Sequence, residues 1–162
     1  MNQEKQPSLK KPEILFLSFM GVGFLPKAPG TWGTLATLPF LYLFGQFNPP
    51  FFIFIPFLLI LTAGSCFIAD HVQRDLHVHD PQWIVIDEVL GMSVTWLFST
   101  KFVLSHLILQ FFLFRIFDIV KVWPASYFDQ KIEHGSGTIL DDIFSGIYAG
   151  IIYKIIATLV NF

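Results

Sequence analysis

Apolar residues along the chain gather into five long segments separated by short polar stretches. The pattern predicts helices over 35–47, 51–69, 83–98, 102–117 and 143–160. The sequence NPP at 48–50 ends the first segment, because proline lacks an amide hydrogen and fixes φ. The 51–69 segment is long enough to cross a hydrocarbon layer of about 30 Å, whereas 35–47 and 83–98 are short for a full crossing.

The composition favours a membrane environment for these segments over a soluble core. Hydrophobic residues make up 54% of the 162 residues and charged residues only 14%, against about 25% charged residues in an average soluble domain. Backbone polar groups in lipid must be satisfied internally, which favours helices. We therefore predict an all-α, polytopic helical membrane protein with four to five apolar helices and a polar site at one membrane face. Residues 1–13 would form a polar N-terminal tail, and 14–162 a single membrane domain.

The charged residues are unevenly distributed if the segments cross in succession. Basic residues then gather on the side of the N-terminus: Lys5, Lys10, Lys11, Lys27, Arg74, Arg115, Lys121 and Lys131. Such a bias marks the cytoplasmic face. All twelve Asp and Glu residues fall on the same side, and chemistry at that face would explain why. The net charge of −2 gives no reason to expect a nucleic-acid partner.

Two clusters of charged residues lie inside or directly against apolar segments. Asp87 and Glu88 stand between IVI and VLGM, and a charge at such depth is costly, which indicates a function. Arg115, Asp118 and Lys121 follow one another at intervals of three residues. An intrahelical ion pair between the first two is the simpler interpretation of that spacing, and it does not exclude a functional role.

A third cluster, Asp141 and Asp142, comes just before the last apolar segment. Aspartates at a helix N-terminus are good caps, which is the alternative to a functional role. If the three clusters converge, their carboxylates repel one another unless a cation joins them, and oxygen ligands suit Mg²⁺. The sequence therefore predicts a Mg²⁺ site, with the last pair also capping its helix. Its ligands would come from Asp87, Glu88, Asp118, Asp141 and Asp142.

A glycine- and proline-rich stretch, GVGFLPKAPGTWGTLATLP, occupies residues 21–39. It matches neither a Walker A sequence nor a dinucleotide fingerprint. We expect a structured loop whose glycines let a ligand approach the backbone; a plain membrane-entry loop is the alternative. The residues expected to bind a substrate phosphate are Lys27, Gly30, Thr31, Arg115 and Lys121.

Four stretches together resemble one family: GVGFLPKAPGTWGTL, DPQWIVIDEVLGM, FRIFDIVKVWP and GSGTILDDIFSG. In this order, over roughly residues 14–160, the chain is similar to bacterial phosphatidylglycerophosphatase A. The family pattern falls on Gly23, Pro26, Lys27, Pro29, Gly30, Thr31, Gly33, Asp87, Glu88, Arg115, Asp118, Lys121, Asp141 and Asp142. The family usually has proline directly after the lysine of the third stretch, where this chain has Val122.

The resemblance implies a membrane enzyme of phospholipid biosynthesis that hydrolyses phosphatidylglycerophosphate to phosphatidylglycerol and phosphate. With the carboxylate pattern it indicates a Mg²⁺-dependent phosphoric monoester hydrolase in the bacterial inner membrane, multi-pass, with its site facing the cytoplasm. Its partners would be the phospholipid substrate and membrane lipid, with no nucleic acid and no obligate protein partner. The expected catalytic residues are Asp87, Glu88, Arg115, Asp118, Lys121, Asp141 and Asp142.

Two other functions remain open from the sequence. One is a phosphatase of another lipid phosphate on the same scaffold. The other is a non-enzymatic membrane protein whose buried acids carry protons.

Motifs of the cysteine, aspartate-nucleophile and histidine phosphatases are absent from the sequence, which leaves metal-assisted hydrolysis as the phosphatase chemistry to expect. His77 and His79 lie in a charged stretch between segments, and we expect a solvated loop there rather than a metal site.

Overall fold

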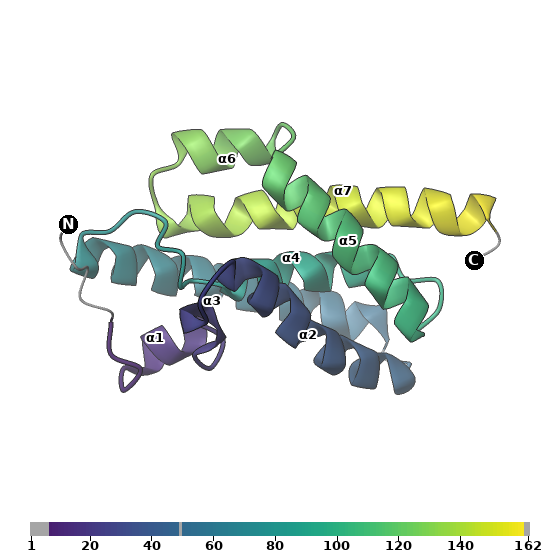
Figure 1. Ribbon diagram of the computed structural model, residues 1–162, viewed down its shortest axis with the longest axis horizontal. Helices are drawn as coiled ribbons and strands as arrows, with labels where there is room; N and C mark the ends of the chain where they lie inside the picture. Colours follow the sequence, from purple (N-terminus) through teal and green to yellow (C-terminus); the bar gives the residue numbers. More distant parts are fainter. Residues whose placement is uncertain (1–6, 49, 161–162) are drawn as a thin grey trace.

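The computed structural model describes residues 7–48 and 50–160, which form seven α-helices and one 3₁₀ turn (Figure 1). No β-strand occurs among these residues, so the prediction of an all-α fold is confirmed. The elements in chain order are α1 (Pro12–Leu17), η1 (Val22–Phe24), α2 (Pro29–Gln46), α3 (Phe51–Leu76), α4 (Ile86–Trp96), α5 (Leu104–Val120), α6 (Ala125–Lys131) and α7 (Gly135–Leu159).

Each of the five predicted segments is a helix, but two of them begin earlier than expected. Helix α2 begins at Pro29, so the second half of the glycine-rich stretch is helical rather than a loop. Proline suits the first helical turn, where its missing amide hydrogen has no partner to lose. Helix α7 begins at Gly135 rather than at 143. A Cβ at Gly135 would overlap the backbone of α3, so close helix packing outweighs the low helix propensity of glycine.

Two short helices, α1 and α6, have no counterpart in the predicted segments. Helix α1 buries Ile14 and Leu17 in the core, and it contains the predicted boundary between residues 13 and 14. Residues 1–6 of the predicted tail, with Lys5, and the last two residues of the predicted domain lie outside the described part. The division into tail and membrane domain stays a prediction.

Helices α3 and α7 are long and apolar enough to cross a membrane, by length and composition. The 26 residues of α3 extend over roughly 39 Å at 1.5 Å per residue, more than the ~30 Å of a hydrocarbon layer. Its surface carries exposed Phe52, Ile60 and Phe67, as expected of a helix that faces lipid. These features agree with a helical membrane protein, with two candidate spans among the described residues.

Helix α4 lies at the centre of the molecule and packs against α2, α3, α5 and α7 (Figure 1). Nearly all its side chains are buried, and Trp96 at its end stacks on Phe102 and meets Phe54 edge-on. The opposite end of α4 carries Asp87 and Glu88. The fold therefore places two carboxylates at one end of its innermost helix, where α2, α5 and α7 can reach them.

Candidate functional site

A polar cavity of about 300 Å³ lies at the carboxylate end of α4, where α4, α5, α7 and the start of α2 converge. The structure brings the three predicted charged clusters together there. Their residues in the cavity wall are Asp87, Glu88, Arg115, Asp118, Lys121, Asp141 and Asp142. Asp80 lines the cavity as well, so its wall holds six carboxylates and two cations. Such a gathering of charge is uncommon beside a membrane and makes this cavity the candidate functional site.

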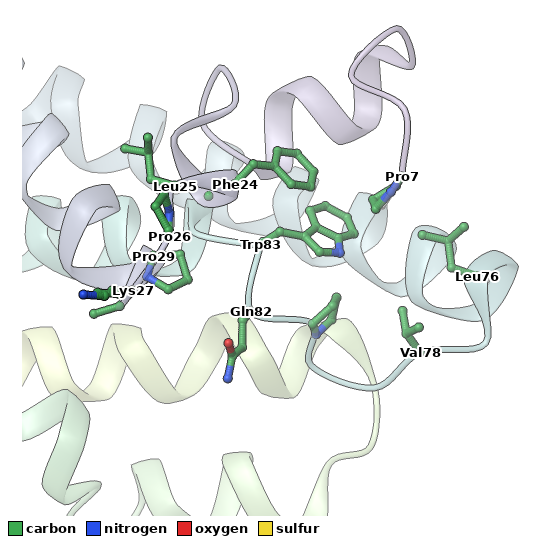
Figure 2. A pocket seen from close by; sticks show the side chains of 13 residues that line it. Pro7, Phe24, Leu25, Pro26, Lys27, Pro29, Leu76, Val78, Gln82 and Trp83 are labelled. Atoms are coloured by element: carbon green, nitrogen blue, oxygen red, sulfur yellow. The ribbon is translucent and has the colours of Figure 1, made fainter. Parts of the chain in front are cut away.

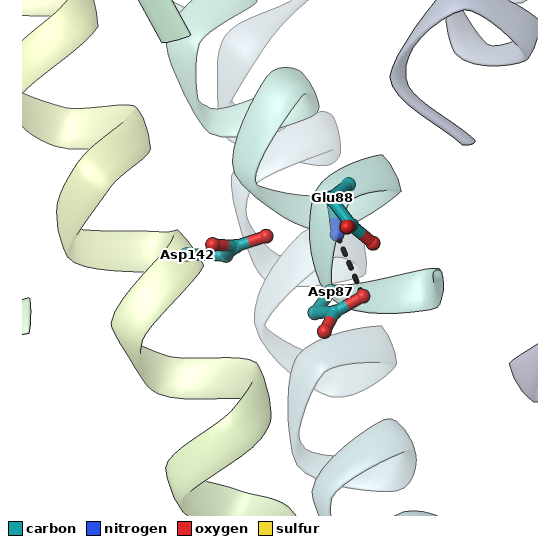
Figure 3. Close-up of side chains that lie close together, drawn as sticks. All are labelled: Asp87, Glu88 and Asp142. Carbon is teal, nitrogen blue, oxygen red and sulfur yellow. Dashed lines mark hydrogen bonds between the residues drawn. The ribbon is translucent and has the colours of Figure 1, made fainter. Parts of the chain in front are cut away.

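Asp87, Glu88 and Asp142 form the tightest group of carboxylates in this cavity. One oxygen from each lies within 4.8 Å of the others, and α7 directs Asp142 across to α4 (Figure 3). Asp87 and Asp142 are buried. The buried Oε2 atom of Glu88 has no hydrogen-bond partner among the described residues. Buried carboxylates at such spacing stay ionised together only with positive charge between them, and an oxygen-only donor set of this kind fits Mg²⁺.

Arg115 links α5 to both α4 and α2 through a single nitrogen. Its Nη1 lies 2.7 Å from Asp118 Oδ2 and 3.8 Å from Glu88 Oε1. The same nitrogen donates a hydrogen bond of 3.3 Å to Thr34 Oγ1 on α2. The predicted intrahelical pair with Asp118 is therefore confirmed, and the guanidinium also contacts two other helices. Thr34 is buried, and its hydroxyl donates a hydrogen bond of 2.9 Å to the carbonyl oxygen of Gly30. The Thr34 side chain is therefore held in place and fixes the position of the guanidinium.

Gly30 lets the first turn of α2 reach the carboxylates. A Cβ at this position would overlap Glu88 Oε1 and lie 3.3 Å from Arg115 Nη1. Any other residue at this position would have to displace the Glu88 carboxylate. The N-terminal end of a helix also carries partial positive charge, which favours carboxylates nearby.

Lys121 lies between two acidic side chains, one of them not anticipated from the sequence. Its Nζ contacts Asp141 Oδ2 on α7, and it lies 3.0 Å from Asp129 Oδ1 on α6. Burial alone would lower the pKa of the Lys121 ammonium, but the Asp141 and Asp129 carboxylates raise the pKa above its ordinary value. The side chain therefore stays charged. Asp129 was not predicted from the sequence, because the turn between α5 and α6 removes any helical spacing between it and Lys121.

Asp141 and Asp142 do not cap α7, so that part of the prediction is wrong. The N-cap residue is His134, and the helix begins at Gly135. Asp141 is the seventh residue of α7, almost two turns inside the helix. The unpaired amide groups of a helix occupy only its first turn, so capping does not explain these two buried aspartates.

The glycine-rich stretch reaches the cavity only in part. Gly30 lines it, whereas neither Lys27 nor Thr31 is among the described residues in its wall. Lys27 instead lines a second cavity of about 720 Å³ next to the first (Figure 2). Further described residues in the wall of the first cavity are Asp80, Gln82 and Thr138. All three lie within the motif stretches DPQWIVIDEVLGM and GSGTILDDIFSG, but none was singled out there, and the folded chain places them in the cavity wall.

The histidines lie away from the carboxylates. His77 and His79 belong to the connection between α3 and α4 and line a separate cavity, in agreement with the expected loop. His106 is buried in α5, and its Nδ1 lies 2.6 Å from the Tyr153 hydroxyl of α7.

Comparison with known proteins agrees with the motif resemblance. The family model described as phosphatidylglycerophosphatase A matches residues 15–157. A phosphatidylglycerophosphatase A of Haemophilus influenzae is 35% identical over 152 residues, which cover 93% of this chain and 92% of the relative. The Escherichia coli protein of the same name is 34% identical over 154 residues, 91% of this chain and 85% of the relative.

A third relative carries a different name. A Bacteroides thetaiotaomicron protein named "Putative phosphatidylinositol-3-phosphatase" is 28% identical over 155 residues, 91% of this chain and 96% of the relative. No solved structure matches the chain.

Proposed function

The chain belongs to the phosphatidylglycerophosphatase A family, and from this membership we propose that it hydrolyses phosphatidylglycerophosphate in phospholipid biosynthesis. The net reaction consumes one water. The bond between the terminal phosphorus and the glycerol oxygen breaks, and inorganic phosphate and phosphatidylglycerol are released. The observation that carries this proposal is the single cavity in which six carboxylates meet Arg115 and Lys121, because phosphoryl transfer needs both anionic ligands and cations.

We propose that this cavity binds Mg²⁺ through Asp87, Glu88 and Asp142, with Asp118 and Asp141 as further candidate ligands. The close spacing of the first three and the unpartnered Oε2 atom of Glu88 support the proposal. When bound, the ion would polarise the phosphomonoester and lower the pKa of a bound water.

The two cations would bind the non-bridging oxygens of the terminal phosphate. Arg115 is fixed by Asp118 and Thr34, and Lys121 is fixed by Asp141 and Asp129. Side chains that are already positioned lose little freedom when the substrate arrives, so their charge stabilises the transition state efficiently. One carboxylate outside the metal set would accept the proton of the attacking water. Asp118 and Asp141 suit this role, because they line the cavity but lie outside the closest group of three carboxylates.

We further propose that the protein is a multi-pass protein of the inner membrane with the cavity on the cytoplasmic side. The two candidate spans and the basic residues on the side of the cavity support this orientation. The diacylglycerol chains would stay in the lipid while the headgroup enters the cavity from the interface.

A phosphatase of another lipid phosphate is the second candidate. The relative whose name refers to a phosphatidylinositol phosphate favours it, since related scaffolds can act on different headgroups. A proton-carrying membrane protein is the third alternative, and it would have no need of Arg115 and Lys121 beside the acids.

Phosphate release by the purified protein in detergent tests the proposal. We expect phosphate from phosphatidylglycerophosphate in the presence of Mg²⁺, loss of the activity with EDTA, and recovery when Mg²⁺ is added back. Phosphatidylinositol 3-phosphate, assayed in parallel, separates the first two candidates. A protein that releases phosphate from neither lipid at any Mg²⁺ concentration would favour the non-enzymatic alternative.

A further inference from the structure

We propose that the 720 Å³ cavity beside the carboxylates binds the unreacting part of the lipid substrate, with Lys27 contacting its phosphodiester. The cavity lies between the η1–α2 loop, the end of α3 and the connection from α3 to α4 (Figure 2). The inference rests on the proposed function, because it assigns a subsite to the phosphodiester of a lipid whose phosphomonoester is hydrolysed in the neighbouring cavity.

The two cavities adjoin each other and share part of their walls. Ala28, Pro29 and Gln82 line both of them, so one extended ligand can occupy both. Phosphatidylglycerophosphate carries its phosphomonoester and its phosphodiester at opposite ends of one glycerol. When the monoester lies beside the carboxylates, the diester is therefore only one glycerol away. At that distance the diester would lie next to the wall that the two cavities share.

The larger cavity combines apolar and polar surface, as the interfacial part of a phospholipid requires. Phe24 and Trp83 stack with ring centroids 5.7 Å apart and an interplanar angle of 9°. Lys27 and Pro29 lie at one edge of the cavity, and Leu76 lies at the other (Figure 2). Leu76 is also the last residue of candidate span α3. The cavity therefore lies where that helix would leave the membrane, at the level of the lipid phosphodiesters.

Lys27 has a free positive charge at the junction of the two cavities. Its side chain is exposed, and no carboxylate of residues 7–48 and 50–160 lies within ion-pair distance of it. Arg115 and Lys121, in contrast, are both paired. A lysine ammonium binds phosphate as a compact point charge. Phosphatidylglycerophosphate and phosphatidylinositol 3-phosphate both contain a phosphodiester, so the subsite suits the chemistry that the two lipids share.

Two inhibitors of phosphatidylglycerophosphate hydrolysis can separate the subsites. Short-chain phosphatidylglycerol contains the diester only, and glycerol 3-phosphate contains a monoester only. In Lys27→Gln we expect the Ki of phosphatidylglycerol to rise about tenfold, the loss of one charge-assisted contact. The Ki of glycerol 3-phosphate should change less than about twofold, within the range of ordinary surface substitutions. Lys27→Arg should restore inhibition by phosphatidylglycerol.

Lys131→Gln is the matched control, because Lys131 is exposed on α6 and lines neither cavity. It should leave both Ki values unchanged. Equal increases for both inhibitors in Lys27→Gln would assign Lys27 to the reacting phosphate and overturn the inference. Unchanged values for both would remove Lys27 from substrate binding and overturn it as well. A wild-type protein that releases no phosphate from the lipid would contradict the proposed function itself, and this inference with it, before any variant is compared.

Discussion

Gly91 of α4 and Gly146 of α7 meet backbone to backbone, since a Cβ at Gly146 would overlap the carbonyl oxygen of Gly91. Each glycine follows a site aspartate, Asp87 or Asp142, by four residues, so about one helical turn separates this contact from the carboxylates. Thr95 reinforces the contact with a hydrogen bond of 3.1 Å to the Gly146 carbonyl oxygen. The close approach of the two helices therefore sets the distance between the two carboxylates.

Replacing Gly146 with alanine should separate α4 from α7 and impair the site. The added methyl group has no room, and such overpacking costs about 1–3 kcal/mol of folding free energy. We expect a lower melting temperature and a loss of turnover of about tenfold or more, since small displacements of reacting groups are costly. Thermal unfolding and phosphate release of the purified variant measure both effects.

Gly64→Ala in α3 is the control for this substitution. A Cβ at Gly64 meets nothing within 4 Å, and alanine is the better helix former. This variant should keep full turnover and unfold at the same temperature or slightly higher. If Gly146→Ala behaved in the same way, the glycine contact would not determine the geometry of the site.

The apolar pattern predicted the helices well because lipid-facing and core-facing residues are both apolar in this chain. It could not locate the start of α7, since glycine and serine are poor helix formers and only the contact of Gly135 with α3 stabilises that first turn. The capping hypothesis for Asp141 and Asp142 was wrong for this reason. Hydropathy alone placed the helix start at the edge of the apolar run.

The charged residues of the site were predictable because ionisable groups in apolar sequence are rare. Their partners were not predictable. Thr34 and Asp129 are ordinary polar residues in the sequence, and only the packing of α2 on α5 and of α6 on α7 brings them to Arg115 and Lys121. Secondary contacts of this kind depend on three-dimensional proximity, for which a single sequence gives no signal.

Arg115→Lys should cost most of the activity although it keeps the charge. The guanidinium contacts Asp118, Glu88 and Thr34 at once, and the point charge of lysine cannot reproduce its planar fork. We expect kcat to fall about a hundredfold, the scale measured when one preorganised donor is removed. Arg74→Lys, at an exposed position on α3, should leave kcat unchanged. A fully active Arg115→Lys variant would reduce the role of Arg115 to net charge.

Asp129→Asn should lower turnover through the position of Lys121. The substitution removes the carboxylate 3.0 Å from the ammonium, so the pKa of Lys121 should move toward its ordinary value and still leave the side chain charged at neutral pH. We expect kcat to fall about tenfold, the loss of one charge-assisted contact, with no change in the neutral pH profile.

Asp75→Asn is the control for Asp129, because Asp75 is exposed on α3 and paired only with His71 among the described residues. Its kcat should match the wild type. If Asp129→Asn shifted the pH profile near neutrality while kcat at its optimum stayed normal, Asp129 would titrate in the reaction rather than position Lys121.

Asp142→Asn and Asp141→Asn should differ in their response to Mg²⁺. Asp142 belongs to the group with Asp87 and Glu88, whereas Asp141 contacts Lys121. Asparagine keeps the shape but loses the charge that a divalent cation needs. We expect both variants to lose turnover by about a hundredfold or more, as for residues that act as a unit, but only Asp142→Asn to require more Mg²⁺ for half-maximal activity.

The melting temperature without metal should stay unchanged or rise in Asp142→Asn, because one of several adjacent like charges is removed. Equal Mg²⁺ requirements in Asp142→Asn and the wild type would exclude Asp142 as a ligand, and a raised requirement in Asp141→Asn would add Asp141 to the metal set.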